Sequence, residues 1–535
     1  DISVKDGIVE YASFGDVRFQ AEDLYGTRET ETRALRLRGD YQLGTLQFNP
    51  FVTVSDTQFE QTDLRYFADV RGPATYDIRQ DDDYFTITSP IDVTSTKGML
   101  VRQARRFLSK TVDREAAAGL DLTWSVSETL KAEFGFKLRD RSKTRDRFEV
   151  TRSGINQPFE PVSKVLTGFL SDEGRAKGPN SFVVFDPERA FAAYGSQLDP
   201  RTAPQINNYF KVKERVSSAY AMATYSSDNW LINGGLRLTA TALTSDGVER
   251  NQTLKTDTSR SVSSDYADVL PSLNVRYEVM PNLYLRASAA KVLTRPSLTD
   301  LAAYRQIDDV TRTISARNPD LKPFRANQAD LAVEWYFGRD GLLGLGWFHK
   351  DIKSFIATRS SQVDLNGTEY TLTQPVNGNS ATVSGFEANY QQSFDFLPGL
   401  WKHFGVAANY TYTDSSFRDT VSGTGLTYGL PENSEDSYNL TGYYEDDRLS
   451  VRVAHNFRGA FLREIPNPVD GIKIRDDYQQ TDVSMRWTLS PEIQLTLDVM
   501  NVFESQQEEY VYQPRLTDGL FTTGRTWQAG LRAKF

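Results

Sequence analysis

The last nine residues of the chain, 527–535, read WQAGLRAKF, and every second residue from Trp527 to Phe535 is apolar or aromatic. Side chains of a β-strand point alternately to opposite faces, so this stretch has one apolar face and one polar face. The same period of two recurs through most of the chain, most clearly in residues 493–499, 449–457, 331–337, 273–279, 132–138 and 35–43. The pattern predicts an all-β chain with about 17–20 strands.

The composition excludes several functional classes. The chain has 535 residues, no cysteine and only three histidines, His349, His403 and His455. A disulfide framework, a thiolate zinc site and an iron–sulfur cluster are therefore excluded, and we expect no metal site and no cofactor. The net charge of −10 argues against a nucleic-acid partner, because binding to phosphates depends on basic surface. The sequence contains no run of about 18 apolar residues, so it predicts no transmembrane helix.

Short and long connections alternate between the predicted strands. The short ones are turns at 125–129, 226–229, 280–282, 338–341, 397–402, 445–448 and 490–492. The long ones are polar segments at about 60–107, 152–208, 244–265, 298–324, 360–379, 417–433, 464–476 and 514–522. Bacterial outer-membrane barrels have short periplasmic turns and long extracellular loops.

This alternation favours an antiparallel transmembrane β-barrel over residues 1–535, located in the bacterial cell outer membrane and crossing it many times. The apolar face would meet lipid and the polar face would line the lumen, and closure would leave no unpaired edge in lipid. A soluble β-sandwich, jelly roll or propeller is the alternative. Its strands would be shorter, about 5–6 residues on average, than the long segments predicted here.

The longest predicted loop, 152–208, contains the signals of a short helix. Asp186 would cap its first turn, Pro187 fits its start, and Gly195 could end it. Aromatic residues on either side give this helix an apolar face. It is either a lid that contacts a ligand or a helix packed on the neighbouring loops.

Ligand recognition on a rigid β scaffold is usually carried by such loops. Sugar rings stack on aromatic side chains, and sugar hydroxyls need polar partners. The candidate ligand-binding residues are therefore Phe185 and Tyr194 in the first loop, with Tyr304 and Arg305 in the loop at 298–324. No histidine has an evident nucleophile partner, and the sequence lacks G-x-S-x-G, P-loop and dinucleotide-binding motifs. We expect no enzymatic activity and no catalytic residues.

Several segments together resemble the TonB-dependent outer-membrane receptors. NPDLKP at 318–323, followed by EWYF at 334–337, resembles the motif before a late barrel strand of that family, and LTRPSL at 293–298 resembles its usual neighbour. WFHKDIK at 347–353 resembles the next strand, with His349 where tyrosine is commoner. DVMNVF at 498–503 resembles the penultimate strand. Trp527 and the terminal Phe535 resemble the C-terminal signal that the barrel assembly machinery recognises.

The resemblance implies a barrel of 22 strands closed by an N-terminal plug. It also implies energy coupling to the TonB–ExbB–ExbD complex through that plug, contact with outer-membrane lipid and lipopolysaccharide, and an extracellular small ligand. The details are most similar to a large proteobacterial subfamily associated with oligosaccharide uptake. Neither a plug nor a TonB box is found in residues 1–535, so we expect the plug and the first strands to lie outside them.

The resemblance implies active import of a specific ligand, with an oligosaccharide favoured and a metal chelate such as a siderophore as the other ligand class. A passive porin-like channel is the alternative function. An outer-membrane enzyme or a surface-binding protein is a third. The sequence does not identify the ligand, the oligomeric state or any surface lipoprotein partner.

Overall fold

The computed structural model describes residues 1–5, 8–79, 86–92, 94–167, 181–195, 198, 206–378, 380–418, 425–466, 471–512 and 517–534. Seventeen of the described strands follow one another as antiparallel neighbours in a single curved sheet. They are β2 (Ile8–Arg38), β4 (Leu46–Asp77), β6 (Leu100–Ser125), β7 (Leu130–Pro158), β11 (Phe210–Ser226), β12 (Trp230–Asn251), β13 (Thr256–Met280), β14 (Leu283–Thr294), β17 (Phe324–Phe337), β18 (Gly341–Lys353), β21 (Ala381–Ser393), β22 (Phe404–Arg418), β24 (Asp436–Glu445), β25 (Leu449–Arg458), β28 (Tyr478–Ser490), β29 (Ile493–Met500) and β32 (Thr526–Ala533).

This sheet is the wall of an antiparallel β-barrel, and its strand number agrees with the predicted 17–20. At its first edge, β1 (Ile2–Lys5) pairs with the start of β2. Within the described residues, no ladder joins β2 to β32. No helix in the described part of the chain is long and apolar enough to span a membrane.

Shorter elements lie in the connections. They are β3 (Tyr41–Leu43), β5 (Thr86–Thr88), η1 (Glu160–Val162), β8 (Ser163–Thr167), β9 (Ser181–Phe185), α1 (Pro187–Tyr194), β10 (Ile206–Asn207), β15 (Arg305–Asp308), β16 (Thr313–Ala316), β19 (Ile356–Leu365), β20 (Thr368–Asn377), η3 (Gly399–His403), β23 (Thr427–Tyr428), β26 (Phe461–Leu462), β27 (Lys473–Arg475), β30 (Gln506–Val511) and β31 (Thr517–Thr522). Four of them, β26, β27, β30 and β31, form a separate small sheet.

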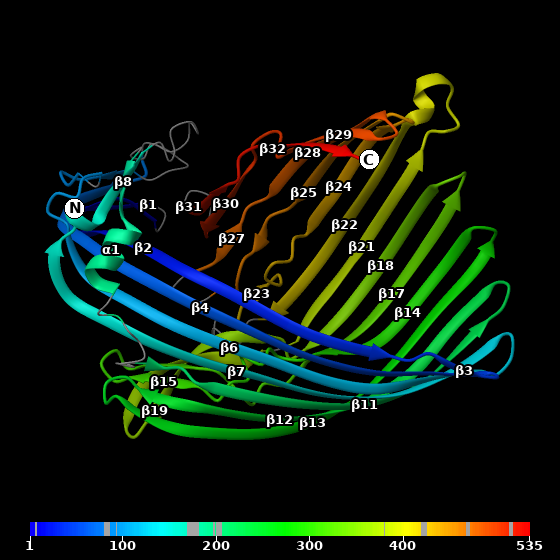
Figure 1. The fold of residues 1–535 in the computed structure, drawn as a ribbon, viewed down its shortest axis with the longest axis horizontal. Coiled ribbons are helices and arrows are strands. Elements are labelled where there is room, and N and C mark those ends of the chain that lie inside the picture. The colour runs from blue at the N-terminus through cyan, green and yellow to red at the C-terminus, as the bar shows by residue number, and fades with distance from the viewer. Residues whose placement is uncertain are drawn as a thin grey trace.

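The two ends of the sheet differ as predicted. The seven predicted short turns all join consecutive strands, as between β6 and β7 or between β28 and β29. Three of these turns contain a left-handed residue, namely Asn282 at φ 67°, Gly338 at φ 60° and Gly399 at φ 66°. Figure 1 shows α1, β15 and β19 gathered at one end of the strands and β3 at the other. The end with α1 is the extracellular end if the short turns are periplasmic.

Several predicted loops are shorter than the polar segments that suggested them. The segment 244–265 is mostly strand, because β12 continues to Asn251 and β13 begins at Thr256. Similarly, β4 extends to Asp77 and β7 extends to Pro158. Beyond the lipid both faces of a strand contact water, so the apolar alternation that identifies a strand disappears while the backbone ladder continues.

Apolar side chains on the outer face form a belt that is exposed in the isolated chain. It includes Phe134, Phe136, Leu238, Val333, Leu345, Val453 and Leu531. Towards the loops, this face changes to charged pairs across strands, Arg114 with Asp56 at 2.6 Å and Arg215 with Asp140 at 2.7 Å. A charge near the bilayer midplane is costly, so these pairs mark the limit of the lipid-facing belt.

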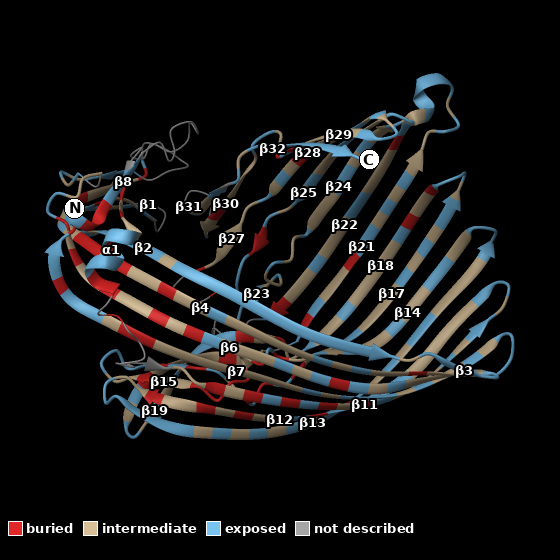
Figure 2. Cartoon of the chain, viewed as in Figure 1, coloured by how far each residue is buried: buried red, intermediate tan, exposed pale blue. Residues whose placement is uncertain are grey.

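The apolar cores lie at the loop end. Buried residues concentrate around α1 and the neighbouring ends of β2 and β4, whereas much of each strand elsewhere alternates between exposed and intermediate (Figure 2). A second buried cluster forms where residues 298–304 pack on β11 and β12. The connections at the loop end therefore fold as ordered structures against the barrel wall.

Candidate functional site

The helix predicted in the loop 152–208 is α1, with the predicted ends. The Arg189 backbone N–H donates to the Asp186 carboxylate at 3.1 Å, and Gly195 is the C-cap residue. The hydrogen bond from this N–H holds the pKa of the Asp186 carboxyl below its usual value. Pro187 occupies the first turn, where its missing N–H costs no hydrogen bond.

Phe185 and Tyr194, two of the predicted ligand-binding residues, lie in one apolar cluster. The Phe185 side chain is 0% exposed, and its ring centroid lies 4.5 Å from that of Phe159 and 5.3 Å from that of Tyr66. Tyr194 is 7% exposed and also contacts Tyr66, with a centroid distance of 6.4 Å. Burial raises the pKa of the Tyr194 phenol. Both rings anchor the loop in this structure.

The backbone of Phe185 is fixed as firmly as its ring. Its N–H donates to the Asp23 carboxylate at 2.8 Å, and the Tyr25 hydroxyl donates to its carbonyl at 2.5 Å. Both partners come from β2, so the loop is joined to the barrel wall by hydrogen bonds as well as by apolar contact. This arrangement matches the interpretation of α1 as a helix packed on its surroundings.

Tyr304 belongs to the second cluster, and Arg305 follows it as the first residue of β15. Tyr304 is 7% exposed, and its hydroxyl donates to Gln306 at 2.6 Å. Burial raises the pKa of Tyr304 to about 12, although the charges of nearby arginines act in the opposite direction. Arg305 forms an ion pair with Glu249 at 3.5 Å. Ligand contact by these four predicted residues remains a prediction, because the structure brings them together only in two separate pairs.

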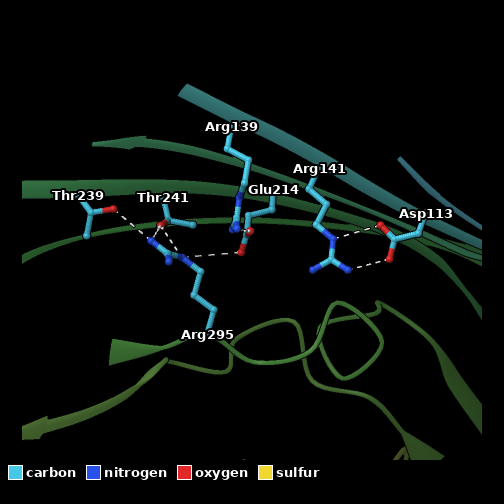
Figure 3. A network of polar contacts seen from close by, with 7 residues as sticks. All are labelled: Asp113, Arg139, Arg141, Glu214, Thr239, Thr241 and Arg295. Carbon is cyan, nitrogen blue, oxygen red and sulfur yellow. Dashed lines mark hydrogen bonds and ion pairs between the residues drawn. The ribbon is translucent and has the colours of Figure 1, made fainter. Parts of the chain in front are cut away.

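A polar network on the lumen wall lies deeper than these loops (Figure 3). Glu214 on β11 is 3% exposed, and a side-chain nitrogen of Arg139 on β7 lies 2.7 Å from its carboxylate. Arg295, which follows β14, approaches the same carboxylate at 3.9 Å and donates to Thr239 at 3.1 Å and Thr241 at 3.0 Å. One buried carboxylate thus joins two guanidinium groups from distant parts of the chain.

A neighbouring ion pair extends this network along β7. Arg141 donates two hydrogen bonds to Asp113 on β6, at 3.1 Å and 2.7 Å, and Lys143 lies 4.0 Å from the same carboxylate. Such bidentate pairs hold the guanidinium plane in a fixed direction. The lumen wall therefore presents cations in defined positions.

Three contacts show how lumen-facing polar side chains join different strands of the wall. Arg139 pairs with Glu214, Arg286 pairs with Glu334 at 2.8 Å, and Tyr220 donates to Asp121 at 2.8 Å. The contact of Arg295 with Glu214 was not predicted, because the segment LTRPSL at 293–298 contains no acidic residue that would indicate a charge partner. A detectable signal was present on β7, where every second residue from Lys137 to Arg147 is basic.

Among the described residues, the hydrogen bonds of the two strand histidines go to hydroxyl groups, and their rings lie beside Trp347 and Tyr438. His349 Nδ1 lies 2.8 Å from the Ser384 hydroxyl, and His455 Nδ1 lies 2.9 Å from the Thr481 hydroxyl. A nucleophile–base pair is normally oriented by a third group, such as a carboxylate. In the described part of the chain neither histidine has a carboxylate contact, so these pairs do not form a triad.

Of the two residues of the predicted C-terminal signal, Trp527 is exposed on β32, beside Val499 of β29. Phe535 lies outside the described residues. Recognition of this strand by the assembly machinery stays a prediction.

Comparison with known proteins gives one family and many structures. The sequence matches the family model described as "TonB dependent receptor-like, beta-barrel" over residues 8–502. The search of the curated proteins found no match. The fold is similar to that of the ferric-catecholate import receptor Fiu from E. coli K12, with a TM-score of 0.56 and 14% identity over 97% of this chain and 75% of that one.

Two further structures show the same fold. The unliganded ferric citrate transporter FecA has a TM-score of 0.52 and 12% identity over 94% of this chain and 70% of that one. The siderophore receptor PiuA from Acinetobacter baumannii has a TM-score of 0.51 and 13% identity over 100% of this chain and 82% of that one. At these identities the similarity concerns the fold alone.

Proposed function

The chain belongs to the TonB-dependent receptor β-barrel family, whose members are outer-membrane transporters and not enzymes, and on this premise we propose that it imports one specific extracellular ligand. The family match over residues 8–502 carries this proposal. The ordered loops at one end of the barrel support it, because binding residues on a rigid β scaffold are usually carried by such loops.

The ligand class is the finer part of the proposal. The sequence favours an oligosaccharide, with a metal chelate as the other class. Tyr194 and Tyr304 are buried in this structure, so an oligosaccharide would stack on them only if the loops move. Phe191, on the outer side of α1, remains exposed and offers a ring face without such movement.

The remaining partners are proposed on chemical grounds. The exposed apolar belt fits outer-membrane lipid, and the charged pairs above it lie where lipopolysaccharide headgroups would begin. Energy coupling would act through TonB–ExbB–ExbD and a plug. The barrel assembly machinery would recognise the C-terminal strand that contains Trp527.

Uptake by cells tests the transport proposal. Cells that produce the full-length protein would be given radiolabelled maltodextrin or radiolabelled ferric citrate, with and without TonB. We expect uptake of one probe to require both the protein and TonB. Uptake that persists undiminished without TonB would instead assign a passive channel.

A deletion tests the role of the α1 loop. Removing residues 182–195 should abolish saturable uptake of the accepted probe while leaving heat-modifiable folding of the barrel intact. If the deleted protein takes up the probe as the parent does, this loop is only structural. The loops at 60–107 and 298–324 would then be the next candidates.

A further inference from the structure

The inner face of β7 has a continuous row of cations. Six successive alternate residues are basic, namely Lys137, Arg139, Arg141, Lys143, Arg145 and Arg147. Phe136 and Leu138, on either side of Lys137 in the sequence, are exposed on the lipid face. At about 3.3 Å per residue, the six positions cover roughly 33 Å along the strand. The row therefore runs from the loop end towards the middle of the lumen wall.

Carboxylates neutralise this row only in part. Glu214 is shared by Arg139 and Arg295, and Asp113 is shared by Arg141 and Lys143. Glu149 is shared by Arg147 and by Arg105 of β6. Within the described residues, Lys137 and Arg145 form no ion pair, and the buried Nε of Arg145 has no hydrogen-bond partner. Glu115 of β6 faces the same side and is the register partner of Arg141. Cations thus outnumber the carboxylates that hold them.

A cavity of about 210 Å³ lies beside this row, between β7, β11, β12 and the segment after β14. Its polar lining consists of four cations and two hydroxyl-bearing residues, namely Lys137, Arg139, Arg237, Arg295, Ser218 and Thr239. No carboxylate residue lines it. A water molecule occupies about 30 Å³ in the liquid, so the cavity has room for a group the size of a phosphate or a small polycarboxylate.

Two of the four cations around the cavity, Arg139 and Arg295, share the Glu214 carboxylate, and the other two lie over aromatic rings. The Arg237 guanidinium lies 4.8 Å from the centre of the Tyr220 ring, and the Lys137 ammonium lies 5.7 Å from the centre of the Phe51 ring. Arg295 is fixed by threonine hydroxyls. The buried Nε of Arg139 has no hydrogen-bond partner among the described residues. Guanidinium groups fixed in this way are ready to donate to an oxyanion.

We propose that this cavity binds an oxyanion carried by the imported ligand, and that the substrate class is therefore anionic, with carboxylate or phosphate groups. This inference rests on the proposed transport function and makes its ligand class more specific. It excludes a neutral oligosaccharide, and it admits an acidic oligosaccharide or a metal chelate with carboxylate groups. The cationic row on β7 would guide the anion between the mouth and the cavity.

Calorimetric titration of the full-length protein in detergent tests the site, with sodium citrate, sodium phosphate and the neutral sugar maltotriose as probes. We expect saturable binding of citrate, weaker binding of phosphate and no binding of maltotriose, and we expect added salt to weaken citrate binding. Binding of phosphate as tightly as citrate would assign the cavity to a phosphate group of the ligand. Absence of saturable binding of both anions would overturn the proposal.

Variants without a carboxylate partner test the lining residues with little risk to folding. Arg237→Gln and Lys137→Gln should each lower citrate affinity by about tenfold or more, because a hydrogen bond to a charged group is lost. Arg452→Gln, on the lumen wall outside the cavity, is the matched control and should leave affinity unchanged. Equal citrate affinity in Arg237→Gln, Lys137→Gln and the parent would overturn the proposal.

A polypeptide segment, such as a plug, is the competing occupant. Residues 1–535 contain no cysteine, so Arg237→Cys adds a single thiol to this part of the protein for cross-linking. Cross-linking of this position to a plug segment, unaffected by citrate, would assign the cavity to the plug and overturn the proposal. The transport proposal is tested separately, since TonB-dependent uptake that persists in the absence of citrate binding refutes only the anionic site.

Discussion

Replacing Phe185 by alanine tests whether the α1 loop is anchored to the barrel wall by a single buried ring. Phe185 is 0% exposed and contacts Phe159 and Tyr66, while its backbone bonds to Asp23 and Tyr25 do not depend on the ring. Phe185→Ala therefore removes apolar packing and leaves the hydrogen bonds available.

The expected cost is about 3–5 kcal/mol, the usual range for removing a buried phenylalanine ring. The cost applies to local opening of the loop, because the barrel ladder does not include Phe185. Since every 1.4 kcal/mol is a factor of ten, the open population should rise by at least about a hundredfold.

Hydrogen exchange measured by mass spectrometry would follow peptides from α1 and β9 against peptides from β11 and β12. Exchange should accelerate in the first pair only, and the barrel should keep its heat-modifiable mobility. Phe191→Ala is the matched control, because Phe191 lies on α1 with its ring 47% exposed. Equal protection of α1 in the Phe185 and Phe191 variants would refute the anchoring role.

Three further predictions concern the membrane register, the second loop cluster and the small extracellular sheet. Val333→Arg should destabilise the barrel in lipid by roughly 2–4 kcal/mol, because Val333 faces the membrane. Ala332→Arg, whose side chain points into the lumen, should cost much less. Both free energies can be measured by folding titrations in vesicles, and equal costs would show that the register is wrong. Because burial raises the pKa of Tyr304 to about 12 from an ordinary value of 10.0, its neutral form stabilises the folded loop fully below pH 10, and this contribution is lost as pH rises to about 12. The alkaline absorbance titration of Tyr304→Phe should therefore lack one phenol that titrates near pH 12 in the parent, and a missing phenol near pH 10 would contradict the burial. Glu509 is 1% exposed between Arg463 and Arg475, so Glu509→Ala should destabilise the sheet of β26, β27, β30 and β31 by up to about 3 kcal/mol. Limited proteolysis would detect this loss as faster cleavage of the sheet. Glu464→Ala, at an exposed residue, is the control, and equal cleavage of the two variants would contradict the prediction.

The amino-acid sequence by itself determined the strands and the two ends of the barrel. Both are local properties, because alternation between two faces and a turn of a few residues are encoded within about ten residues. The turns at 226–229 and 280–282 and the helix capped by Asp186 were predicted for this reason. Polar strand ends such as that of β12 were mistaken for loops, because both of their faces contact water.

Only the tertiary structure decided which side chains meet. Glu214 joins Arg139 and Arg295 because β7 and β11 are neighbours and the chain after β14 returns to the inner wall. The residues next to Glu214, Arg139 and Arg295 in the sequence indicate neither this strand pairing nor this return of the chain. Phe185 likewise lies in a loop of the sequence, where an aromatic side chain is expected to be exposed. It is buried because the fold brings Tyr66 and Phe159, from other segments of the chain, into contact with its ring. The alternation of apolar residues and the residue types of a turn act over a few residues. Burial and ion pairing depend instead on contacts between distant segments, which form only when the sheet curves.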